Sequence, residues 1–64
     1  MLLDGGKINL ALARAAKSPI ELARDAKISE STLTRIRNGR SARQKTAGKI
    51  ARALGVDVTE LLKD

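Results

Sequence analysis

Polar and basic side chains surround two apolar ones between Ser29 and Arg40. Leu33 and Ile36 lie three residues apart, so a helix that turns both toward a core turns the polar residues outward. The residues then exposed are Ser29, Glu30, Ser31, Thr34 and Arg35. Arginine can donate two hydrogen bonds to guanine, glutamate can accept one from cytosine, and hydroxyl groups can serve several base edges. We therefore expect these five residues to read bases in the major groove of duplex DNA.

Two of these side chains also have simpler interpretations. Arg35 could neutralise a phosphate group or extend into solvent. Glu30 could be a first-turn acid that the helix dipole favours. The group as a whole favours base reading more strongly than any single member does.

A second set of polar residues is placed to contact the DNA backbone. Ser18 stands at an expected helix start, where free backbone N–H groups attract anions. The other members follow the base-reading residues in the chain. The expected phosphate contacts are Ser18, Asn38, Arg40, Arg43 and Lys45. Such contacts position a protein on DNA without specifying the sequence.

Capping signals place both sets on a pair of short helices. Ser18 and Glu21 have the spacing of a capping box, and Pro19 occupies the first helical position, where its missing N–H costs nothing. Ser29 is the expected N-cap of the next helix. About three residues separate the two helices, so residues 18–38 or thereabouts predict a helix-turn-helix.

Apolar spacing predicts three further helices, which gives an all-α fold class with five short helices and no strands. The first is expected after Gly6 and extends to about Lys17, the fourth ends at Gly55, and the fifth follows a capping box of Asp57 and Glu60. The 64 residues should form a single domain around one core. The expected core is Ile8, Leu12, Leu22, Ala23, Ile28, Leu33, Ile36, Ile50, Leu54, Val58 and Leu61.

The last predicted helix suggests a contact between two copies of the chain. Val58, Leu61 and Leu62 offer more apolar surface than so short a helix can bury beneath itself. We expect these three residues to form a dimer interface.

The composition limits the classes of function. The chain contains no Cys, His, Phe, Tyr or Trp. This removes the usual general base, the thiolate metal ligands and the stacking platforms that bind single-stranded nucleic acid. We expect no enzymatic activity, no cofactor and no metal ion. The apolar runs are too short to span a membrane and the N-terminus lacks the pattern of a signal peptide, so a cytoplasmic protein without a membrane partner is expected.

The positive charge is concentrated in one region. The net charge is +6, and the segment from Ser31 to Val56 carries seven basic residues and no acidic one. Nucleic acid, an anionic membrane and an acidic protein are all candidate partners on charge alone. A membrane helix should add bulky aromatic residues and an RNA-binding module should add stacking residues, and neither is present.

Several segments resemble the helix-turn-helix domains of the lambda and 434 phage repressors and Cro, with their bacterial relatives of the XRE type. The matching segments are residues 21–23, 28–36, 38–39 and 50–56. The resemblance implies a five-helix domain that works as a homodimer on a two-fold DNA operator, with its third helix in the major groove.

Three residues depart from the pattern of this family. Lys27 occupies the turn position where the family usually has Gly, so either a left-handed conformation is strained there or the turn differs slightly from that of the family. Pro19 stands where members often carry a phosphate-contacting Gln. Arg37 replaces an often acidic residue that pairs with an Arg of the first helix, so the usual ion pair should be absent.

Two functions remain open from the sequence. The first is a sequence-specific regulator of transcription, in its simplest form a repressor. The second is an antitoxin-like protein that binds its own promoter and also a partner toxin. No segment outside the domain is visible that would bind a toxin, and the sequence hardly separates the two.

Overall fold

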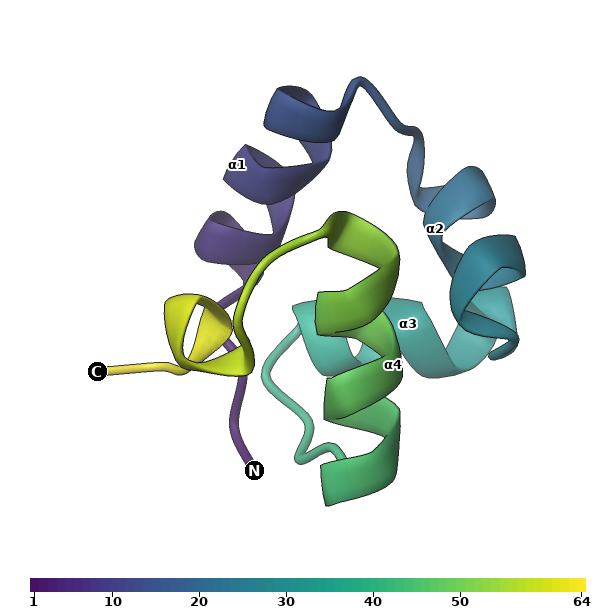
Figure 1. The fold of residues 1–64 in the computed structure, drawn as a ribbon. Coiled ribbons are helices and arrows are strands. Elements are labelled where there is room, and N and C mark those ends of the chain that lie inside the picture. The colour runs from purple at the N-terminus through teal and green to yellow at the C-terminus, as the bar shows by residue number, and fades with distance from the viewer.

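Four α-helices and one short 3₁₀ turn make up the fold (Figure 1). The computed structural model describes residues 1–64. In chain order the elements are α1 (Gly5–Ala15), α2 (Pro19–Ala26), α3 (Glu30–Arg37), α4 (Gln44–Leu54) and η1 (Val58–Leu61). The all-α prediction is confirmed, and the only β pairing is an isolated bridge between Leu3 and Leu62.

A capping box fixes the start of α2. The Ser18 hydroxyl accepts a hydrogen bond from the Glu21 N–H at 3.2 Å, and the Glu21 carboxylate accepts one from the Ser18 N–H at 2.9 Å. The bonds from the Ser18 backbone and hydroxyl lower the pKa of Glu21. A carboxyl whose pKa is lowered on folding stabilises the fold above its ordinary pKa, and this contribution is lost as the pH falls through the lowered value.

The boundaries of α1 differ from the prediction because of its caps. Asp4 is the N-cap and accepts a hydrogen bond from the Lys7 N–H at 3.0 Å, so the helix already begins at Gly5. At its other end Ala16 adopts the left-handed conformation with φ 55°, which ends the helix before Lys17.

The fifth predicted helix is only a 3₁₀ turn of four residues. Its start is as predicted, because Asp57 and Glu60 form the expected capping box. The turn ends at Leu61 since the next residue, Leu62, is extended and pairs with Leu3. Tertiary pairing with the N-terminal segment therefore stops the helix.

The core contains 15 buried residues, all of them apolar. Nine of the eleven predicted core residues are among them, whereas Ile28 and Val58 are only partly buried and pack against the cluster. The prediction missed Leu3 and the smaller residues. The additional buried residues are Leu3, Ala11, Ala26, Ala42, Ala47 and Ala51.

Burial of Leu61 overturns the argument for a dimer interface at this position. Its side chain is 1% exposed within a single chain. Val58 and Leu62 are partly buried against the same core. The premise that this turn cannot hide its apolar side chains is wrong, because the core of the same chain takes up Leu61.

The turn between α2 and α3 places Lys27 in the left-handed conformation, which is unfavourable for a residue with a side chain. Lys27 takes the left-handed conformation, with φ 58° and ψ 45°, and its N–H bonds to the Arg24 carbonyl at 3.2 Å. The following N–H, of Ile28, bonds to the Ala23 carbonyl at 3.0 Å. These bonds hold a conformation that costs a residue with a Cβ atom about 1–2 kcal/mol.

The end of α3 is held against α1 by two contacts that involve Arg37. The guanidinium donates two hydrogen bonds to Asn9 Oδ1, at 3.2 and 2.8 Å. The Arg37 carbonyl oxygen also lies where a Cβ on Gly5 would stand. An ion pair is absent here, as expected, and a neutral hydrogen-bond acceptor on α1 joins the two helices instead.

Gly5→Ala is expected to destabilise the fold by about 1–3 kcal/mol, because the added methyl group overlaps with the backbone of α3 and forces the helices apart. Gly6→Ala is the matched control. Its Cβ would meet only the flexible Asp4 carboxylate at 3.1 Å. Chemical denaturation of both variants measures the difference, and equal stability of the two would contradict a close approach at Gly5.

Lys27→Gly is expected to stabilise the fold by about 0.5–1 kcal/mol, because relief of the left-handed strain exceeds the entropy that glycine adds to the unfolded chain. Lys27→Ala removes the same side chain but keeps the strain, so it should leave stability nearly unchanged. Thermal unfolding of the two variants provides the comparison. A glycine variant no more stable than the alanine variant would show that the turn is unstrained.

Candidate nucleic-acid interface

The exposed face of α3 carries four side chains that are free to contact a ligand. Glu30, Ser31, Thr34 and Arg35 are exposed and make no side-chain hydrogen bond or ion pair within the chain. Ser29, the fifth predicted base reader, has a different environment. Its hydroxyl accepts a bond from the Thr32 N–H at 3.0 Å and donates one to Thr32 Oγ1 at 2.8 Å. Capping of α3 therefore occupies most of the hydrogen-bonding capacity of Ser29.

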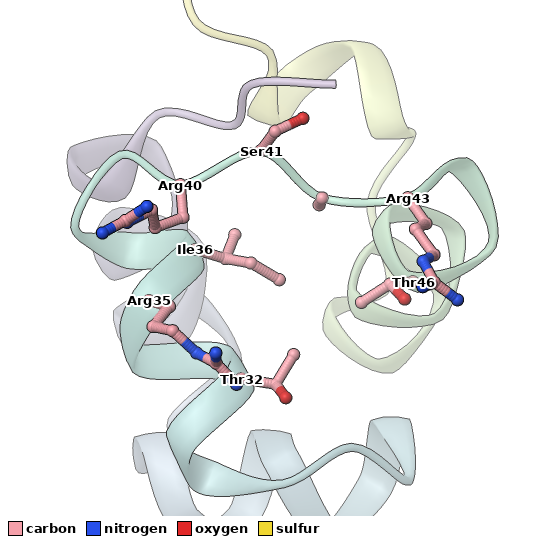
Figure 2. A pocket seen from close by; sticks show the side chains of 8 residues that line it. Thr32, Arg35, Ile36, Arg40, Ser41, Arg43 and Thr46 are labelled. Atoms are coloured by element: carbon pink, nitrogen blue, oxygen red, sulfur yellow. The ribbon is translucent and has the colours of Figure 1, made fainter.

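A polar groove of about 540 Å³ lies between α3 and the start of α4 (Figure 2). Arg35 and Thr32 extend toward it from α3, and Arg43 and Thr46 stand on the opposite side. Its lining consists of Thr32, Arg35, Ile36, Arg40, Ser41, Ala42, Arg43 and Thr46. Three arginines and no acid make this groove attractive to anions.

The start of α4 adds backbone donors to this groove. The N-cap residue, Arg43, makes no side-chain cap, and the first turn contains no acid. The first helical bond runs from the Ala47 N–H to the Arg43 carbonyl at 2.9 Å. The N–H groups of residues 44–46 therefore have no partner within the chain, which is the arrangement that binds phosphate at a helix N-terminus.

These free N–H groups were not among the phosphate contacts predicted from the sequence. Arg43 and Lys45 were predicted to contact phosphate because of their charge alone. Two signals were available in the sequence. Position 43 lacks a capping side chain, and no Asp or Glu follows in the next turn.

The basic segment keeps its charge because no acid neutralises it. The three ion pairs of the chain involve Lys7, Arg14 and Lys17, which all lie before α2. None of the seven basic residues between Ser31 and Val56 takes part in an ion pair. The groove therefore faces solvent with uncompensated positive charge.

The structure places the five predicted phosphate contacts at different sites. Arg40 and Arg43 line the groove, and Lys45 lies in the exposed first turn of α4 beside it. Asn38 lines a separate hollow of about 260 Å³ with Gly39 and Arg37.

Ser18 is separated from the other four, at the start of α2. Its hydroxyl and N–H both bond to Glu21, so a carboxylate already occupies this helix N-terminus. A phosphate at this position would meet a negative charge that is absent from the start of α4.

None of the helices is long and apolar enough to cross a membrane. The chain also has no cluster of three or more His, Cys, Asp or Glu side chains that could hold a metal ion.

Comparison with known proteins agrees with this geometry. The model of a helix-turn-helix family matches residues 10–61, which include α2, α3, α4 and the turns between them. No curated protein and no solved structure gave a match. The matched residues include the helix pair α2 and α3, the residues that line the basic groove, and η1. The chain therefore belongs to the helix-turn-helix family of DNA-binding regulators that includes the lambda and 434 phage repressors and Cro.

Proposed function

We propose that this chain represses transcription by binding a specific duplex operator, with α3 in the major groove. One observation carries the proposal. The four unpartnered side chains of α3 adjoin a groove with three arginines and the free N–H groups of α4. A helix that presents base-reading groups beside backbone anchors is the arrangement of a recognition helix.

The site supports a division between reading and anchoring. Arg35 lies on α3 and has a side chain long enough to donate two bonds to guanine O6 and N7. Arg40, Arg43, Lys45 and the first N–H groups of α4 flank α3 on the side of the groove, where a DNA strand bordering the major groove would pass. The flanking groups fix the position of α3, and the side chains of α3 select the sequence.

Glu30 opposes DNA binding unless it faces a base. Its carboxylate lies in the first turn of α3 and has no cationic partner in the chain. Near the phosphates it would weaken binding to every sequence, whereas opposite cytosine N4 it can accept a hydrogen bond. We infer that Glu30 contributes selection against sequences without cytosine at that position, together with Ser31 and Thr34.

We also propose that two copies bind one operator. The family resemblance supports this proposal. The apolar surface of Val58, Leu61 and Leu62, predicted from the sequence as the dimer interface, supports it less, because Leu61 is buried within the chain. Val58 and Leu62 retain partial exposure and remain available at the edge of such a contact. A contact this small would form mainly on the DNA, where two bound copies are held side by side.

Arg35→Ala should cost about 1–3 kcal/mol on the operator and relax the preference at one base pair, while affinity for random DNA changes little. Arg35→Lys keeps the charge but loses the paired donors, so it should lose the same preference. Binding of each variant to operator and random duplexes measures both quantities. If Arg35→Ala weakens binding to the two DNAs equally, Arg35 contacts phosphate and not a base.

Arg40→Ala should weaken binding to operator and random DNA alike. It should also reduce the slope of log K against log salt by about 0.9, because one phosphate is no longer neutralised by the protein. Arg52→Ala is the matched control, because it removes the same charge from the far end of α4, outside the groove. Salt titrations of both variants test the assignment, and identical slopes would place Arg40 away from the DNA.

Cooperative binding of two copies should protect two half-sites about 34 Å apart on one face of the DNA. The distance follows from one helical turn, which brings equivalent surfaces of the duplex to the same side. Footprinting over a range of protein concentrations gives the measurement. Protection of a single half-site that never extends at high concentration would rule out the paired arrangement.

A further inference from the structure

The N-terminal segment runs between the C-terminal residues and the loop that joins α3 to α4 (Figure 1). Leu3 anchors it in the core with 1% exposure. On one edge the Leu2 carbonyl accepts a hydrogen bond from the Lys63 N–H at 3.0 Å, and the Asp4 N–H donates one to the Leu61 carbonyl at 2.7 Å. The segment is thus fixed to the body of the fold on that edge.

The other edge of the same segment bonds to the loop that carries Arg40 and Arg43. The Met1 carbonyl accepts a hydrogen bond from the Ala42 N–H at 2.7 Å, and the Met1 nitrogen donates one to the Ala42 carbonyl at 2.7 Å. The Met1 nitrogen also donates to Ser41 Oγ at 3.2 Å. Ser41 and Ala42 form no other backbone hydrogen bonds, so Met1 supplies all the backbone pairing at this point of the loop.

Without Met1 this loop would have no backbone hydrogen bond between Arg40 and Arg43, and the buried side chain of Ala42 would be its remaining anchor. Gly39, at its start, has φ 101°, a conformation open to glycine, and the Arg40 N–H makes the last backbone bond to α3, to the Arg35 carbonyl at 3.0 Å. Ser41 and Ala42 then form the wall of the groove between Arg40 and Arg43. A displacement of Ala42 would change the distance between these two arginines and the width of the groove.

We propose that residues Met1–Leu3, here called the strap, position the loop for DNA binding by holding Arg40 and Arg43 at the spacing that reaches the phosphates. The inference rests on the proposed function, since it assigns a role to the strap in that same site. The strap contacts no DNA in this proposal. Its effect passes through the paired backbones of Met1 and Ala42.

The test replaces one backbone amide by an ester in the full 64-residue chain, which is short enough for chemical synthesis. An ester at Ala42 removes the N–H that bonds to Met1 but leaves the buried methyl group in place. An ester at Asp64 is the control, because the Asp64 N–H and the Lys63 carbonyl, which the ester also alters, form no hydrogen bond in the chain. Each protein is titrated with operator and random duplexes over a range of salt concentrations.

The Ala42 ester should bind both DNAs about three- to tenfold more weakly than the Asp64 ester, because the loop must then be ordered on binding, at a cost of up to about one net hydrogen bond. Its slope of log K against log salt should fall by up to about 0.9, as expected when the protein neutralises one phosphate fewer. Its preference for operator over random DNA should not change, since α3 keeps its place. A folded Ala42 ester with the affinity and salt slope of the control would overturn the proposal.

Amide exchange on the unmodified chain gives a second measurement that does not depend on the folding of the ester. DNA binding should slow the exchange of the Ala42 amide, because the strap and the loop are then held together. An Ala42 exchange rate that DNA leaves unchanged would also overturn the role of the strap. Failure of the unmodified chain to bind duplex DNA at all would instead refute the proposed function.

Discussion

The structure depends on small alanine side chains at the contacts between helices, which allow the helix backbones to pack closely. The chain has no aromatic residue, so its core must be filled by aliphatic side chains of modest volume. Six of the 15 buried residues are alanines, and both α2 and α4, which pack closely on each other, contribute two each. Small side chains at the contact let helix backbones come together without voids. The position of α3 follows from this packing, because a short turn ties it to α2.

A second close approach fixes the other end of α3. The Arg37 carbonyl meets α1 at Gly5, and the Arg37 guanidinium donates to Asn9. The family resemblance implies an ion pair between these helices. Here a cation meets a neutral amide, so the contact adds no acid to the region next to the basic groove and leaves the charge of Arg37 in place.

The start of α4 differs from the starts of the other elements in its cap and in the charge around it. The starts of α1, α2, α3 and η1 are capped by Asp4, Ser18, Ser29 and Asp57. Only α4 begins without a side-chain cap, and it does so beside three unpaired arginines. An uncapped helix start is a local loss of stability. In the proposed complex these free N–H groups would donate to a phosphate, which would offset that loss.

The sequence by itself determined the helices, most of the core and the exposed face of α3. Ser18, Ser29 and Gly55 mark helix ends through local hydrogen bonding or backbone freedom, and Leu33 with Ile36 orients α3 through the helical repeat. These signals act within a few residues, so they can be read from the chain directly. The tertiary structure decided the length of η1, the burial of Leu61, and the pairing of Met1 with Ala42. Those features join residues about 40 or more positions apart in the chain, or depend on such a pairing, and no local pattern of residue types specifies which distant backbone will come to lie beside them.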